Sequence, residues 1–173
     1  MDGFESNEKS FLADRMVGRL GRWLRMMGVD CASAEGLLAP EVLDKALAER
    51  RVLVTRDTGL MKRRTRVERF FIRSNFVQEQ VLEFLGAYPI DPLERAFTRC
   101  VECNEPLERV EKESLSDEVP VYVRRTQDVF SRCPACKRVY WAATHRRRME
   151  TRLRSLGQKT LEKREGTNAD DLV

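Results

Sequence analysis

Residues Arg51–Asp57 read RVLVTRD and give the clearest strand signal in the chain. The predicted strand, Arg51–Thr55, is apolar and β-branched, is flanked by charge and is followed closely by an acid, Asp57. A shorter, mostly apolar segment, Ser10–Ala13, also ends at an acid, Asp14, and predicts a second buried strand. The chain therefore contains two strands that each deliver a carboxylate at their carboxyl end.

Helical patterns alternate with these strands. A helix is predicted over residues 15–27 and is ended by Gly28 in the left-handed conformation. Its apolar stripe consists of Met16, Leu20, Trp23 and Met27. Further elements are expected as a strand within 29–34, a helix starting near Pro40, a short helix or loop at 59–64, a strand at 70–72 and a helix at 76–85. Alternating strands and helices predict an α/β fold with a parallel sheet, which binds ligands at the carboxyl ends of its strands.

Two Cys-x-x-Cys pairs follow this region. They consist of Cys100, Cys103, Cys133 and Cys136. Four thiols in two such pairs match the tetrahedral coordination of a structural Zn²⁺ ion. A redox-active pair is the alternative, but Pro134 lies inside one pair and neither has a thioredoxin-like strand–helix setting. We therefore expect a structural zinc ion.

The prolines within Tyr88–Pro92 mark a domain boundary. The expected domains are an α/β domain over residues 8–90, a zinc ribbon over 97–143, a C-terminal helix over 144–156 and a disordered polar tail over 157–173. Within the ribbon, Val119–Val123 and Val139–Trp141 are predicted to be strands. Tyr140 and Trp141 either stack on nucleobases or pack the small ribbon core.

The bulk properties limit the class of protein. Hydrophobic residues make up 42% of the 173 residues, which is enough for a core, and no apolar run approaches the ~20 residues of a membrane helix. The polar start MDGFESNEKS lacks the apolar region of a secretory signal. Cys31 is unpaired, and the other four cysteines have metal-type spacing. These features lead us to expect a reducing, cytoplasmic location.

Basic residues are locally concentrated although the net charge is only +4. The three clusters are Arg15, Arg19, Arg22 and Arg25; Lys62, Arg63, Arg64, Arg66 and Arg69; and Arg146, Arg147 and Arg148. Any single cluster is explained by a solvated helix face. Three clusters beside a zinc module favour a nucleic-acid partner, because local basic groups neutralise phosphates even when acids elsewhere cancel the total.

The acids suggest a reaction. Cleavage of a phosphodiester by Mg²⁺ or Mn²⁺ needs carboxylates that converge on one point. Asp14 and Asp57 are the anchors, because both fall at the carboxyl ends of predicted strands. Asp30 and Glu41 are the next candidates, with Asp44 one turn further along the same helix as Glu41. Most of the 28 acids are expected to be solvated surface groups.

Several stretches together resemble one known family, the Mut-seven C-terminal ribonuclease family. They are Phe11–Asp30, Arg51–Asp57, Cys100–Asn104 and Cys133–Cys136, followed by Val139–Trp141 and His145. The resemblance runs over residues 10–155, in order and with compatible spacing. It implies a PIN-like nuclease fold, a parallel sheet flanked by helices, followed by a small zinc ribbon and a C-terminal helix.

The resemblance also implies roles for individual residues. Asp14 and Asp57 become catalytic acids that bind Mg²⁺ or Mn²⁺, and Glu41 stands where the family places its middle acid. Where PIN-like sites often have a fourth acid, this chain reads Arg73–Asn75. The arginines expected to hold the RNA backbone are Arg15, Arg19, Arg22, Arg56, Arg63 and Arg64.

These observations predict a metal-dependent ribonuclease whose zinc ribbon helps to bind the substrate or a partner, such as the ribosome or another RNA-processing protein. Two alternatives stay open. One is a catalytically weak RNA- or ribosome-binding module in which the basic face does the binding. The other is a toxin-type nuclease controlled by a protein partner.

Overall fold

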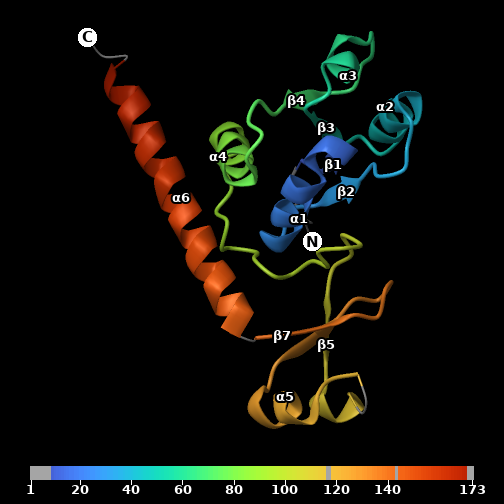
Figure 1. The fold of residues 1–173 in the computed structure, drawn as a ribbon, viewed down its shortest axis with the longest axis vertical. Coiled ribbons are helices and arrows are strands. Elements are labelled where there is room, and N and C mark those ends of the chain that lie inside the picture. Colours follow the sequence, from blue (N-terminus) through green and yellow to red (C-terminus); the bar gives the residue numbers. More distant parts are fainter. Residues whose placement is uncertain (1–8, 116–117, 143, 171–173) are drawn as a thin grey trace, which may run out of the picture.

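The computed structural model describes residues 9–115, 118–142 and 144–170 (Figure 1). A parallel sheet with its helices forms one end of the molecule, a small antiparallel sheet forms the other, and a long C-terminal helix runs back along the first (Figure 1). None of the helices in the described part of the chain combines the length and apolar character that crossing a bilayer requires.

The parallel sheet has the strand order β2-β1-β3-β4. Its strands are β1 (Phe11–Ala13), β2 (Cys31–Ser33), β3 (Val52–Thr55) and β4 (Arg69–Phe71). Strand β1 is central, so that Leu12 lies opposite Ala32 on one side and Leu53 on the other. The chain passes from β1 outward to β2 and then back across to β3. The sheet therefore reverses its winding direction at β1, the position at which open α/β sheets bind ligands.

Both faces of the sheet are covered by helices. The helical elements are η1 (Arg15–Val17), α1 (Gly18–Met26), α2 (Ala39–Ala48), α3 (Thr58–Lys62) and α4 (Val77–Ala87). Phe11 points into a core with α1 and α4, whereas its neighbour Leu12 points into a second core with α2. Successive strand residues face opposite sides, so a sheet buried on both faces needs continuous apolar strands. The run FLA is such a strand.

The antiparallel sheet has the order β5-β6-β7. Its strands are β5 (Glu108–Val110), β6 (Phe130–Arg132) and β7 (Val139–Trp141), and the connection from β5 to β6 holds η2 (Lys112–Ser114) and α5 (Val121–Thr126). The sequence pattern predicts β7 but neither β5 nor β6. Trp141 packs against the ribbon core, as one of its two predicted roles requires.

The predicted strand at Val119–Val123 is wrong. Helix α5 begins directly after Pro120, and the segment buries Val119 and Val123, while Val121 and Tyr122 between them are exposed. A strand would have placed Val121 on the same side as the two buried valines, which its exposure contradicts. Val119 lies before the helix, next to its cap Pro120, and Val123 lies in the first turn of the helix.

The C-terminal helix α6 (Thr144–Asp170) extends far beyond the predicted end at residue 156, so the expected disorder is wrong for residues 157–170. Helix α6 contacts α4, and Leu153 and Leu156 belong to the same core as α1. A side chain at Gly157 would meet Pro92 Cγ at 3.1 Å, so this glycine permits a close approach between segments and does not end the helix. The buried Thr160 hydroxyl donates to the carbonyl of Leu156 at 2.9 Å.

A buried arginine joins the two sheets. The Arg25 guanidinium donates through Nε to the carbonyl of Cys31 at 2.7 Å. Its Nη1 atom donates to the carbonyls of Val101 and Glu102, both at 2.8 Å. One side chain therefore connects α1, β2 and the turn between the first two cysteines, which docks the ribbon on the α/β domain.

Candidate active site and metal centre

Asp14 and Asp57 meet at the carboxyl edge of the parallel sheet. Asp14 follows β1, and Asp57 follows the neighbouring strand β3, with Ala13 and Val54 paired in register. The two acids line one hollow of about 150 Å³, together with residues of η1, the segment before α2 and the start of α3. The structure therefore brings the two anchor acids of the sequence analysis together.

Asp14 is buried and held in a fixed orientation. Its Oδ1 atom accepts hydrogen bonds from the backbone amides of Met16, at 2.7 Å, and Val17, at 3.1 Å. Its Oδ2 atom accepts a short hydrogen bond from the Thr55 hydroxyl. A carboxylate that accepts amide hydrogen bonds in this way caps the first helical turn, and the cap turns the side chain toward the end of the strand.

Asp57 caps α3 in the same manner. Its Oδ1 atom accepts hydrogen bonds from the amides of Gly59, at 2.7 Å, and Leu60, at 3.3 Å. Its own amide donates to the Thr55 hydroxyl at 2.9 Å. The hydrogen bonds of the described residues thus engage Oδ1 of Asp57 and leave Oδ2 available to a ligand.

The other two candidate acids lie elsewhere. The Glu41 carboxylate accepts a hydrogen bond from the Leu38 amide at 2.6 Å, so that it caps α2, and Glu41 does not line the hollow. Asp30 precedes β2, at the opposite edge of the sheet from Asp14. Among the described residues, the only group of three or more potential metal ligands within reach of one another is the set of four cysteines.

Asp30 belongs to the junction between the two sheets. Its carboxylate pairs with Arg51 at 2.6 Å and accepts a hydrogen bond from the Asn104 side chain at 2.7 Å. Partial burial opposes the charge, but these two hydrogen bonds outweigh it, so the pKa of Asp30 lies below its ordinary value. Asn104 also accepts a hydrogen bond from the Cys31 amide, at 2.9 Å, through its side-chain oxygen.

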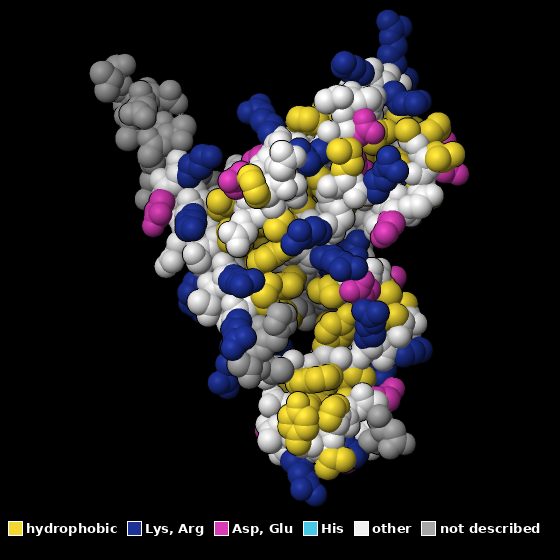
Figure 2. Space-filling view, in the orientation of Figure 1, with side chains coloured by type: hydrophobic (Ala, Val, Ile, Leu, Met, Phe, Trp, Pro, Cys, Tyr) yellow, Lys and Arg dark blue, Asp and Glu magenta, His cyan; other side chains and the backbone are white. Residues whose placement is uncertain are grey.

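The predicted RNA-binding arginines fall into two groups. Arg15 in η1 and Arg19 and Arg22 in α1 are exposed, and Arg15 also lines the hollow. Figure 2 shows Lys and Arg side chains gathered over α1 and the adjoining ribbon. At the ribbon end, Glu102 pairs with Arg22 at 3.1 Å and with Arg138 at 3.3 Å.

The remaining arginines of the prediction lie beyond β3. The Arg56 guanidinium donates to the side-chain oxygen of Asn75. Arg63 and Arg64 are exposed and follow the end of α3. Arg69, from the same basic cluster, donates to backbone carbonyls at the end of α3, including that of Leu60 at 2.9 Å, so that it serves the fold.

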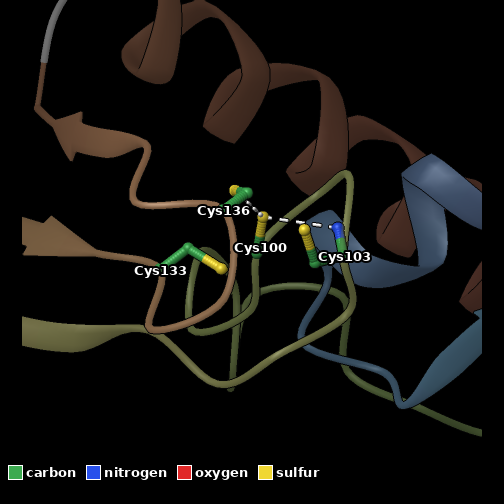
Figure 3. Close-up of side chains that lie close together, drawn as sticks. All are labelled: Cys100, Cys103, Cys133 and Cys136. Carbon is green, nitrogen blue, oxygen red and sulfur yellow. Dashed lines mark hydrogen bonds between the residues drawn. The ribbon is translucent and has the colours of Figure 1, made fainter.

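The four cysteines converge at the ribbon (Figure 3). Their sulfur atoms all lie within 4.8 Å of one another, and the Sγ atoms of Cys100 and Cys136 are 3.7 Å apart. A tetrahedral zinc ion with Zn–S bonds of about 2.3 Å requires sulfur–sulfur separations of about 3.8 Å. The four cysteines could therefore hold a structural metal ion such as zinc.

The surroundings of Cys100 favour the thiolate form that metals bind. Burial opposes its ionisation, but hydrogen bonds from the Tyr140 hydroxyl, at 3.1 Å, and the Cys103 amide, at 3.4 Å, lower the pKa of Cys100 to about 7. Cys31 shows the contrast. It is fully buried away from the cluster, and burial raises its pKa to about 12. Cys31 therefore acts as a small hydrophobic residue of the core.

The model of one protein family, described as the Mut7-C RNAse domain, matches residues 9–153. The chain belongs to the Mut7-C RNase domain family. The match covers the parallel sheet, the ribbon and the first part of α6, and it confirms the resemblance found in the sequence. No curated protein and no solved structure matches the chain.

Two residues of this Mut7-C RNase domain were missed by sequence reasoning. Thr55 joins the acid pair, because its hydroxyl donates to Asp14 and accepts from the Asp57 amide. Its signal was present, since it is the one hydroxyl residue at the end of the apolar run before Asp57. Arg25 was grouped with other basic residues of its cluster, although it is buried and its guanidinium donates to three backbone carbonyls. No local pattern reveals those partners, because two of them lie in the ribbon.

Proposed function

We propose that this protein is a divalent-metal-dependent ribonuclease whose reaction takes place at Asp14 and Asp57. The observation that carries the proposal is the placement of two carboxylates, which follow adjacent parallel strands, in one hollow. The Thr55 hydroxyl donates to the Asp14 carboxylate and accepts from the backbone amide of Asp57. Membership of a family of ribonuclease domains names the reaction class. The position at the carboxyl edge of the sheet is where α/β folds bind ligands.

The donor set fits one Mg²⁺ or Mn²⁺ ion. Mg²⁺ is commonly bound by one or two carboxylates, with water and substrate phosphates completing its six ligands. Oδ2 of Asp57 is available, and Oδ2 of Asp14 retains a lone pair beside its hydrogen bond from Thr55. Such an ion supplies a Lewis acid for the phosphodiester and activates water for its hydrolysis. The amide hydrogen bonds hold both carboxylates in place before the substrate arrives.

The exposed arginines of η1 and α1 are proposed to bind the RNA backbone. Arg15, Arg19 and Arg22 lie on successive turns, so phosphates held by them would lead from the acid pair toward the ribbon. Glu102 occupies Arg22 and Arg138 in the free protein, so RNA binding at that end would exchange the carboxylate for a phosphate. The ribbon is proposed to hold zinc as a structural ion and to extend the RNA-binding surface.

A second candidate function is an RNA-binding module with weak or no cleavage. One observation favours it: of the carboxylates in the described part of the chain, two line the hollow, and neither Glu41 nor Asp30 is one of them. Sites that use two metal ions clamp both the attacking and the leaving oxygens, which needs more ligands than this pair provides.

Cleavage of labelled RNA in Mn²⁺ separates the two functions. Asp57→Asn keeps a side chain that can cap α3 but removes the anionic ligand, so cleavage should fall on the order of 100-fold or more. Asp128→Asn is the matched control, since this ribbon side chain is 92% exposed, and it should cleave like the wild type. If purified wild-type protein binds RNA and cleaves it no faster than Asp57→Asn, the nuclease proposal fails.

The structural zinc ion is tested separately by metal analysis. Protein purified without chelator should contain about one zinc ion per chain, and Cys100→Ser should lose it. Cys31→Ala, which changes a buried cysteine outside the cluster, should keep the full zinc content. Equal zinc contents in Cys100→Ser and the wild type would contradict coordination by this cluster.

A further inference from the structure

The hollow at the acid pair has an apolar wall. Met16 and Leu38 both line it, and they are 49% and 71% exposed. The rest of that wall is formed by small or aliphatic side chains, namely Ala34, Leu37, Ala39, Val42 and Leu60. Among the described residues that line the hollow, Arg15 carries the one charged side chain besides the two acids.

The exposure of Met16 has a structural cause. The sequence pattern placed Met16 in the buried stripe of its helix, and this prediction is wrong. Asp14 caps a separate 3₁₀ turn, η1, and α1 begins only at Gly18. This break shifts the helical phase, so that Val17 enters the core in place of Met16. The capping that orients the Asp14 carboxylate therefore also turns an apolar side chain outward beside it.

A single exposed leucine needs no explanation, but a contiguous apolar wall facing a charged site suggests a ligand with an apolar face. Figure 2 shows hydrophobic side chains at the surface over α2 among charged ones. Because Met16 and Leu38 are both exposed, their side chains offer an apolar surface beside the acids on which a flat group can lie.

We propose that Met16 and Leu38 form a binding site for the nucleobase next to the phosphate that is cleaved. The inference rests on the proposed function, because the acid pair then fixes where that phosphate lies. A base is linked through its sugar to this phosphate, so it must contact a surface that adjoins the acids. Every base presents an apolar face, and an aliphatic wall accepts that face whatever the base identity.

The chemistry of the wall defines the substrate class. Bases inside a duplex are stacked on their neighbours and cannot lie against a protein wall, so the site takes an unpaired nucleotide. Met16, Leu38 and the other wall residues carry no side-chain donor or acceptor that reads a base edge. A base held on this wall must therefore come from a single-stranded stretch of RNA, and the wall itself does not distinguish one base from another.

Leu38→Ala tests the site with Leu47→Ala as its control. Leu47 is another exposed leucine, at 53%, but it lies near the far end of α2 and does not line the hollow. The substrates are a short single-stranded RNA and the same RNA with an abasic nucleotide on either side of the cleaved phosphate. Leu38→Ala should raise KM about fivefold to tenfold with little change in kcat, and Leu47→Ala should match the wild type.

The abasic substrate completes a double-mutant cycle. With the wild type, one of the two abasic RNAs should raise KM as much as Leu38→Ala raises it with intact RNA. Combining the variant with that abasic RNA should add little further increase in KM. The inference is overturned if Leu38→Ala behaves like Leu47→Ala, or if the two losses multiply. The failure of the proposed function looks different, because Asp57→Asn then cleaves as well as the wild type.

Binding gives a second readout that does not depend on cleavage. Fluorescence anisotropy with Asp57→Asn protein and intact labelled RNA should show the same fivefold to tenfold weakening when Leu38 is also replaced by alanine. Met16→Ala should show a loss of the same direction. Equal affinities for intact and abasic RNA would overturn the base site even if cleavage is never detected.

Discussion

Replacing Arg25 by methionine tests how the ribbon is joined to the α/β domain. Methionine keeps an apolar stem of similar length but removes the guanidinium that donates to the carbonyls of Cys31, Val101 and Glu102. Hydrogen bonds from a charged donor contribute about 1.5–3 kcal/mol each, and their sum is reduced because the freed carbonyls can regain water. We expect a loss of about 3–5 kcal/mol in the free energy of unfolding, which is below the full sum for three such hydrogen bonds.

The assay is urea unfolding followed by tryptophan fluorescence. The chain has two tryptophans, Trp23 in α1 and Trp141 in β7, so the signal reports on both sides of the junction. Arg19→Met is the control, because Arg19 is exposed on the same helix, and its effect should stay below about 0.5 kcal/mol. A difference of less than about 1 kcal/mol between the Arg25 and Arg19 variants would refute the reasoning.

Two further predictions concern stability. Gly28 and Gly36 both have positive φ, at 80° and 82°, but a Cβ at Gly28 would lie 2.1 Å from the carbonyl oxygen of Arg95, whereas nothing lies within 4 Å at Gly36. In the same urea assay, Gly36→Ala should lower the free energy of unfolding only by the backbone strain, about 1–2 kcal/mol, and Gly28→Ala should lower it clearly more. Equal losses in the two variants would contradict the clash at Gly28. Burial disfavours the charge of Asp30, but its hydrogen bonds, that from Arg51 foremost, hold its pKa below the ordinary value of 3.8. The ion pair thus stabilises the fold above that value, and this stabilisation is lost as the pH falls through the lowered pKa. Asp30→Asn should therefore reduce the dependence of the free energy of unfolding on pH in this acidic range. An unchanged dependence would contradict the pairing.

The parts of the fold predicted from sequence are those with strong local signals. The strands at β1 and β3 and the acids that follow them were identified because apolar runs in a doubly covered sheet are continuous and short. Both acids were then correctly expected at one edge, since parallel strands share their carboxyl ends. The four cysteines were identified by spacing, and their sulfur atoms do converge.

The errors arose where distant contacts decide the outcome. Asp30 was one of the candidates for the acidic site, but it precedes β2 and therefore lies at the opposite edge of the sheet from Asp14. Its partners Arg51 and Asn104 come from distant parts of the sequence. Residues 157–170 were expected to be disordered from their polarity, whereas α4 and Pro92 provide a surface for the first turns of this segment.

The wrong prediction that Met16 is buried has a different cause. Helical periodicity was counted from Arg15 as though one regular helix began there, and the 3₁₀ turn capped by Asp14 shifted the phase by one residue. The residue that fails the core pattern lies beside the candidate reaction centre. The exposure of Met16 at that position is the observation that points to the proposed base site.

The central claim is that Asp14 and Asp57 together hold the divalent ion needed for RNA cleavage. A crystal of the zinc-loaded protein soaked in Mn²⁺ tests it directly, because anomalous scattering locates manganese. We predict one manganese peak in the hollow, about 2.0–2.2 Å from a carboxylate oxygen of each aspartate, as for a Mg²⁺-type site, and its loss in Asp57→Asn. Manganese bound elsewhere in crystals of a protein that cleaves RNA, with none between these two carboxylates, would contradict the claim.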